Sequence, residues 1–106
     1  MAITNSGPGI ARIKSIVYYV DRKSVKDPDE ALRYGKLNPD LNHGVEFEDD
    51  DSLAVGQTDW LIDYRTKNKE ELDRFSQFLD EQLAAEVNYC SVDGECWKKC
   101  SYKGRC

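Results

Sequence analysis

The last seventeen residues of the chain contain the same seven-residue phrase twice. Cys-Ser-Val-Asp-Gly-Glu-Cys spans residues 90–96, and Cys-Ser-Tyr-Lys-Gly-Arg-Cys spans residues 100–106. All four cysteines of the protein lie in this segment. Each copy places a glycine two positions before its second cysteine, and Asp93-Gly94 is a strong signal for a tight turn. The repeat predicts two short segments that bend back on themselves and are closed through their cysteines.

Two disulfides are the first way to close such a tail. In the chain-entropy model a seven-residue ring contributes about 2.4 kcal/mol, so two sequential rings contribute about 4.7 kcal/mol. The nested pairing of Cys90 with Cys106 and Cys96 with Cys100 contributes about 5.2 kcal/mol in the same model. This difference is smaller than the strain that the model omits. Energy therefore does not choose the connectivity, whereas the repeat favours two separate rings.

A zinc ion is the second way to close the tail. Cys90, Cys96, Cys100 and Cys106 could supply four thiolates to a tetrahedral site. Structural zinc sites commonly use cysteines separated by two to four residues, whereas the intervals here are five, three and five residues. Lys98 and Lys99 would favour thiolate, which helps metal binding and redox chemistry alike. The cofactor expected for this chain is accordingly none or zinc.

The third interpretation treats the tail as a substrate. A domain followed by a short tail with repeated cysteine and serine resembles the layout of ribosomally synthesised, post-translationally modified peptide precursors. In such a precursor Ser91 and Ser101 would be candidates for dehydration, the cysteines would form thioethers, and the partner would be a modifying enzyme. The stretch AAEVNYC before the tail contains no double-glycine cleavage site.

Length and charge set the limits for the rest of the chain. Its 106 residues are 40% apolar and 33% charged, which suits a single small domain with a tail. The expected division is a flexible arm, an α+β domain and a cysteine-rich tail, at residues 1–9, 10–88 and 89–106. A net charge of -5 makes nucleic acid an unfavourable partner, because like charges repel a phosphate backbone.

The sequence also carries signals for the compartment. No apolar run approaches the roughly 20 residues of a membrane span, and residues 1–14 lack the pattern of a signal peptide. We therefore expect a cytoplasmic protein without a membrane association by default. Closure of the tail by disulfides would instead indicate a secreted protein.

Periodicity predicts five elements before the tail. The β-branched and aromatic run 10–20 predicts a central strand, and Asp27 with Pro28 predicts a short helix that leaves through a left-handed Gly35. Alternation predicts strands at 45–48 and 59–65, separated by a charged turn at 48–51. Asn68 and the apolar spacing that follows predict a helix over 69–87. The resulting β-α-β-β-α order is an incomplete ferredoxin-like fold, which could complete itself as a homodimer.

The sequence favours binding over catalysis. His43 is the single histidine, and its turn-rich surroundings predict an exposed loop position. The acidic stretch EFEDDD is typical of a solvated turn. Trp97 is a large ring in a hydrophilic tail, so it either packs back on the domain or contacts a partner. We therefore expect a small, acidic, non-enzymatic protein-interaction module, whose partner-binding residues are Trp97, Lys98, Lys99, Tyr102, Lys103 and Arg105.

Overall fold

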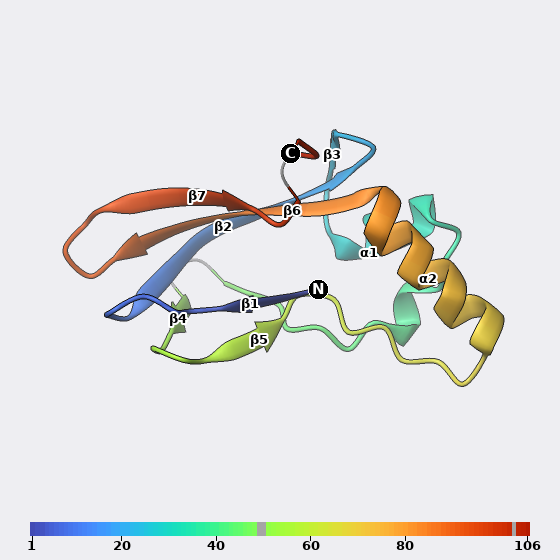
Figure 1. The fold of residues 1–106 in the computed structure, drawn as a ribbon, viewed down its shortest axis with the longest axis horizontal. Coiled ribbons are helices and arrows are strands. Elements are labelled where there is room, and N and C mark those ends of the chain that lie inside the picture. The colour runs from blue at the N-terminus through green and yellow to red at the C-terminus, as the bar shows by residue number, and fades with distance from the viewer. Residues whose placement is uncertain (49–50, 103) are drawn as a thin grey trace.

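The computed structural model describes residues 1–48, 51–102 and 104–106, and these residues form an α+β fold with a cysteine-rich C-terminal tail. Within these ranges there are two α-helices, one short 3-10 helix and seven strands (Figure 1). In chain order the elements are β1 (Ala2–Thr4), β2 (Ala11–Val20), β3 (Lys23–Val25), α1 (Pro28–Tyr34), η1 (Pro39–Leu41), β4 (Asp51–Leu53), β5 (Thr58–Trp60), α2 (Lys69–Glu81), β6 (Leu83–Ser91) and β7 (Cys96–Cys100). Neither helix in the described ranges has the length and apolar character needed to cross a membrane.

Strands β2 and β6 form the centre of a five-stranded sheet. The order along the sheet is β3-β2-β6-β7, and β4 also pairs with β2. β2 and β6 run antiparallel from the pair Ala11 and Ser91 to the pair Val20 and Leu83, with an irregularity between Ile13 and Ser15. The strand predicted at 10–20 is therefore confirmed.

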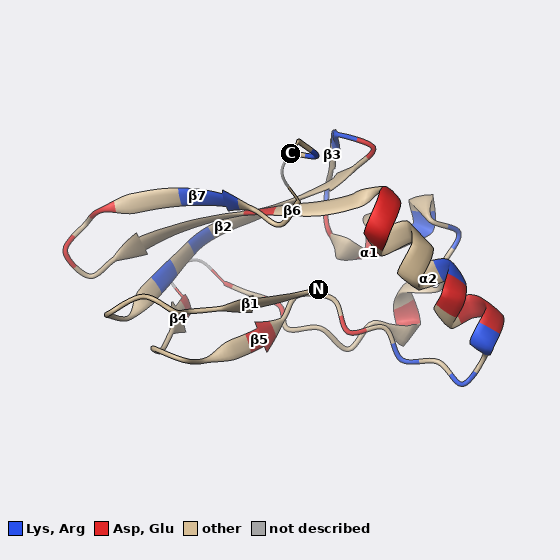
Figure 2. Cartoon of the chain, viewed as in Figure 1, with Lys and Arg blue, Asp and Glu red and all other residues tan. Residues whose placement is uncertain are grey.

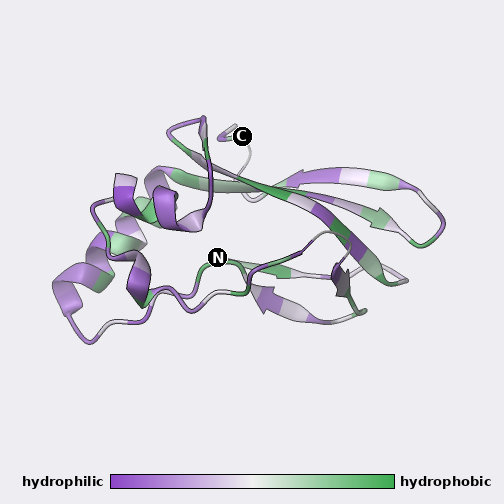
Figure 3. Ribbon diagram, turned by 180° about the vertical axis from the view of Figure 1, so that it is seen from behind, coloured by the Kyte–Doolittle hydropathy of each residue, from purple (hydrophilic) through white to green (hydrophobic). Residues whose placement is uncertain are grey.

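Four elements lie against the inner face of this sheet. Figure 1 shows β1 and β5 beneath the half of the sheet that carries the β6–β7 turn, whereas α1 and α2 gather at the opposite end. Hydrophobic residues lie along β2 and β6, and the outer surface of α2 is hydrophilic (Figure 3). The largest side chains that are almost fully buried come from α1, from the segment after β5 and from the start of β6, namely Leu32, Leu61, Ile62 and Leu83.

The first nine residues are partly built into the fold. β1 pairs with β5, so that Ala2 lies opposite Trp60 and Thr4 lies opposite Thr58. The buried side chain of Asn5 donates hydrogen bonds to the carbonyl oxygens of Gly9 and Leu53, at 2.9 and 2.8 Å. Backbone pairing thus orders part of the segment that the sequence predicts to be a flexible arm.

Local capping signals place the start of both helices correctly. Asp27 Oδ1 accepts a hydrogen bond from the Glu30 N–H at 2.8 Å, and Asn68 Oδ1 accepts one from the Glu71 N–H at 3.1 Å. The predicted left-handed exit at Gly35 is wrong, because Gly35 has a φ of -81° and the left-handed residue is Lys36. Gly35 lies close to a neighbouring ring instead: a Cβ there would be 2.9 Å from Phe78.

The end predicted for the second helix is also wrong. α2 ends at Glu81, and residues 83–91 form β6. Leu83 and Val87 fit the helical spacing, but residues four apart also share one face of a strand. Residues 83–91 are a strand because they pair with β2 over their whole length. The local sequence pattern cannot show this, because β2 lies far away in the sequence.

The two remaining strand predictions need correction as well. Residues 45–48 are not a strand, although the Val45 N–H donates to the Trp60 carbonyl oxygen at 2.7 Å. The predicted turn at 48–51 includes Asp49 and Asp50, which lie outside the described residues, and Asp51 begins β4. The strand at 59–65 is reduced to Thr58–Trp60. The predicted alternation of buried and exposed side chains does not hold after Trp60, because Leu61 and Ile62 are adjacent and both are buried.

The incomplete ferredoxin-like order is therefore not confirmed. The observed order is β-β-β-α-β-β-α-β-β, apart from the short 3-10 helix, and β6 follows α2 as the antiparallel partner of β2. The division into a domain and a separate tail at residues 88 and 89 stays a prediction, and β6 runs across that boundary.

Two buried tyrosines support the core. Tyr64 stacks on Phe75 with ring centres 5.0 Å apart, donates its hydroxyl to the Glu71 carboxylate and accepts from the Asn38 N–H at 3.0 Å. Burial is the largest cause that raises the pKa of Tyr64. On β2, burial raises the pKa of Tyr18 to about 12.

Candidate functional site: the disulfide-closed tail

The first copy of the repeat is the tip of the β6–β7 hairpin. Cys90 and Cys96 lie opposite each other in the ladder and form a disulfide with a Cα–Cα distance of 4.0 Å. The Gly94 N–H donates to the Ser91 carbonyl oxygen at 3.1 Å, and the Ser91 N–H donates to that of Glu95 at 2.8 Å. Gly94 has a φ of 89°, which only glycine adopts readily, so the turn predicted at Asp93-Gly94 is confirmed.

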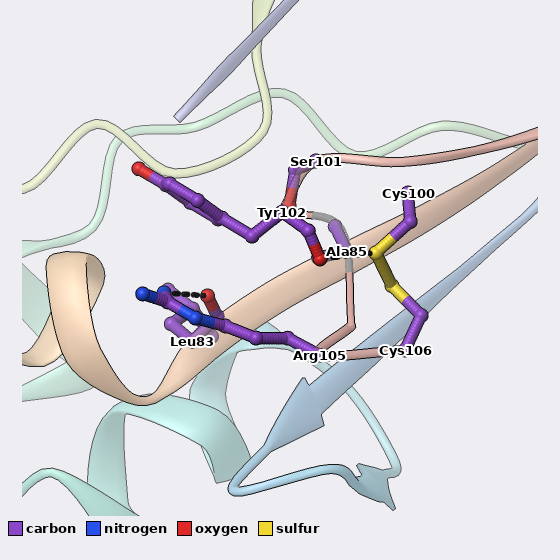
Figure 4. Close-up of a disulfide and its surroundings, with 7 residues drawn as sticks. All are labelled: Leu83, Ala85, Cys100, Ser101, Tyr102, Arg105 and Cys106. Atoms are coloured by element: carbon purple, nitrogen blue, oxygen red, sulfur yellow. Dashed lines mark hydrogen bonds between the residues drawn. A yellow bond between two sulfur atoms is a disulfide. The ribbon is translucent and has the colours of Figure 1, made fainter.

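The second copy has the same spacing but a different turn. Cys100 and Cys106 form a disulfide with a Cα–Cα distance of 6.1 Å (Figure 4). Here the Arg105 N–H donates to the Tyr102 carbonyl oxygen at 3.1 Å, and Gly104 has a φ of 87°. The turn therefore begins one position later in the repeat than in the first copy. The prediction of two separate rings is confirmed, although the rings are not alike.

The disulfides account for all the thiols of the tail. None of the four cysteines is free. Zinc would need them as thiolates, and no group of three or more histidine, cysteine, aspartate or glutamate side chains is arranged around a common metal position within residues 1–48, 51–102 and 104–106. Of the two ways of closing the tail, the structure has the disulfide one.

Arg105 joins the second ring to the end of helix α2. Its guanidinium donates hydrogen bonds to the carbonyl oxygens of Leu79 and Leu83, at 3.1 and 3.3 Å, and to that of Asp80. The last carbonyls of a helix lack partners within the helix and carry partial negative charge. Since α2 has no basic residue in its own last turn, Arg105 supplies the missing cation from the tail.

Neighbouring groups hold Arg105 in place. The guanidinium carbon lies 4.3 Å from the centre of the Tyr102 ring, which is a cation–π contact (Figure 4). Ser101 continues the sheet beyond β7, because its N–H donates to the Ala85 carbonyl oxygen and its Oγ accepts from the Ala85 N–H, both at 2.9 Å. Tyr102 and Arg105 thus turn toward α2, away from the rest of the predicted partner-binding set.

The other predicted residues gather on β7, which is the edge strand of the sheet. Trp97 stacks on Tyr89 with ring centres 5.7 Å apart and is still 45% exposed. Lys98 and Lys99 are exposed, and Figure 2 shows them as a basic segment on an edge whose turn is acidic. Trp97 therefore packs back on the sheet with one face and leaves the rest of its surface open.

Other predicted residues lie apart from this edge or outside the described residues. Lys103 is not among the described residues. Ser91 is the last residue of β6, directly before the hairpin turn. His43 is exposed in a loop, where its backbone N–H donates to the Asp63 carbonyl oxygen at 2.8 Å. Sequence reasoning did not place residues 96–100 on a sheet edge, because CWKKC is too short to show a period.

Comparison of the chain with protein-family models, with curated proteins and with solved structures gives no significant match.

Proposed function

We propose that the protein is a small non-enzymatic interaction module, which binds an extended acidic segment of a partner protein along β7. The observation that supports this proposal is the position of β7. It is the open edge of a sheet, it is held by two disulfides, and it carries an exposed Trp97 beside Lys98 and Lys99. Tryptophan is enriched among the residues that dominate binding energy at interfaces.

The hydrogen-bond pattern defines which backbone groups the edge offers. The ladder between β6 and β7 has a hydrogen-bonded pair at each end, namely Ser91 with Glu95 and Ala85 with Ser101. Bonded and non-bonded pairs alternate in an antiparallel ladder, so Lys98, opposite Asn88, falls in a non-bonded pair. Its N–H and carbonyl groups consequently point to the open edge. A partner strand could bond to them, as in recognition by strand addition.

Charge selects the kind of strand. Two antiparallel copies of β7 would bring the lysines of one copy close to those of the other, and like charges across a ladder are destabilising. A strand with glutamate or aspartate residues would gain from the same contacts, and its encounter would be steered by charge. We therefore propose an acidic partner strand in preference to a second copy of this chain.

The disulfides support a location for this activity. Structural disulfides persist in oxidising compartments and are rare where thiols are kept reduced. We propose that the module works outside the reducing cytosol. The peptide-precursor hypothesis gains no support, because its thioether chemistry needs free thiols and the four cysteines are paired with one another.

The test is a titration of the isotope-labelled protein with a short peptide of alternating glutamate and threonine, followed by amide shifts. We expect the largest shifts at residues 96–100, and weaker binding by about tenfold in Lys98→Glu. Lys67→Glu is the matched control, because it makes the same charge change at an exposed position before α2. Equal binding of a lysine-threonine peptide, or equal loss in both variants, would refute the proposal.

A further inference from the structure

A cleft of about 540 Å³ lies between β1 and the inner face of β6 and β7. This volume is within the range of roughly 300 to 1,000 Å³ that is typical of small-molecule sites. Its walls come from both layers: β1 and the loop after it form one side, and the other side includes Ile13, Ala85, Val87 and Tyr89. Figure 1 shows β1 in this position beneath β6 and β7, away from both helices.

Small side chains explain why the cleft stays open. Ala11, Ala85 and Ser101 line it at positions where a larger side chain would occupy the space between the layers. α2 covers the other end of the sheet and cannot fill this one. Ile13, Leu61 and Val87 form the buried floor of the cleft, and Ile3 and Tyr89 line it with apolar side chains that are still partly exposed. An apolar body is the ligand part that such a surface would accept.

One cation faces this apolar surface. Lys99 is the single charged side chain among the described lining residues, and it forms no hydrogen bond or ion pair with another described residue. The α-amino group of Met1 also lines the cleft, where it donates a hydrogen bond to the Ile62 carbonyl oxygen at 3.2 Å and burial lowers its pKa, which disfavours its charged form. The described lining contains no carboxylate that could neutralise Lys99. A cation beside a partly enclosed apolar surface selects for an anionic group.

We propose that this cleft binds a small amphipathic carboxylate, with its apolar chain against Ile3 and Tyr89 and its carboxylate beside Lys99. The chemistry is that of a medium-chain fatty acid anion. The cleft adjoins the open edge of β7 but does not use Lys98, because Lys98 and Lys99 are adjacent strand residues whose side chains point to opposite faces.

The experiment measures octanoate binding to the whole protein by calorimetry, with octanol as the uncharged analogue. We expect one saturable site for octanoate, and an affinity about tenfold lower for octanol and for octanoate with Lys99→Met. Lys98→Met is the matched control and should bind octanoate as the unmodified protein does. Both variants change exposed side chains and keep most of their length, so the fold should survive, which the unfolding midpoint checks.

Three results would overturn the inference: no saturable octanoate binding, equal affinity for octanol, or equal affinity in Lys99→Met and Lys98→Met. Lys98 also separates the two proposals. Replacement of Lys98 should weaken binding of the acidic peptide and leave octanoate binding unchanged. Either proposal can therefore fail while the other stands.

Discussion

The Arg105 guanidinium donates a hydrogen bond to the carbonyl oxygen of Leu79, 3.1 Å away, and so ties the last ring of the chain to the end of helix α2. The two residues are 26 positions apart. The ring formed by Cys100 and Cys106 encloses Arg105 and limits where its side chain can reach. The second copy of the repeat is thereby part of the packing of the domain.

Replacement of Arg105 should destabilise the fold. We expect Arg105→Ala to lower the free energy of unfolding by about 1 to 2 kcal/mol, because three carbonyl groups lose a charged donor. Urea unfolding followed by circular dichroism measures the change. Arg12→Ala removes an exposed arginine from β2 and should stay within about 0.5 kcal/mol of the unmodified protein. Equal effects of the two variants would contradict a capping role.

The second disulfide and Arg105 should act as a unit. Opening the ring with Cys100→Ser and Cys106→Ser should cost about 2.4 kcal/mol in chain entropy, and it also frees the residue that caps α2. Adding Arg105→Ala to the open ring should then cost clearly less than it does in the closed ring. A double-mutant cycle of unfolding free energies measures this coupling. Strict additivity would show that the ring does not position Arg105.

Proteolysis under non-reducing conditions should release the two rings separately. Lys98 and Lys99 lie between Cys96 and Cys100, so trypsin can cut the only chain segment that connects the rings. Mass spectrometry should find Cys90 linked to Cys96 in one fragment and Cys100 linked to Cys106 in another. A fragment that joins Cys90 to Cys100 or Cys106 would contradict the structure.

Truncation after Asn88 should abolish cooperative unfolding or weaken it severely. It removes β7, the last residues of β6, and the bonds that Ser101 and Arg105 make to Ala85 and α2. Val87 would then lose the strand that lies beside it. Thermal unfolding by circular dichroism is the measurement. A truncated chain that melts as sharply as the full protein would show that residues 89–106 are an independent tail.

Stability should fall in strongly alkaline solution because of Tyr18. Burial raises its pKa from 10.0 to about 12, so the unfolded chain releases this proton at a lower pH than the folded chain does. The contribution is complete below a pH of about 10 and is lost as the pH rises toward 12, and it amounts to about 2 to 3 kcal/mol. Urea unfolding across this window should show a smaller loss for Tyr18→Phe. Tyr34→Phe alters an exposed ring and is the control, and identical curves for both variants would contradict the assignment.

The sequence by itself determined the features that depend on neighbouring residues. Asp27 and Asn68 start the two helices, because a capping side chain bonds to an N–H only three positions ahead. The repeat also favours two separate rings, since each disulfide and each glycine turn closes within seven residues, but the choice of disulfides over zinc comes from the structure. These interactions need no information about the rest of the fold.

Tertiary structure decided everything that depends on distant partners. Residues 83–91 carry apolar spacing that suits a helix and a strand equally, and β2 makes them a strand because pairing satisfies their backbone groups along its whole length. The edge position of β7, the reach of Arg105 to α2 and the cleft beneath Lys99 all arise from that choice. A local pattern cannot encode them, because the free energy that selects them comes from contacts between segments many residues apart.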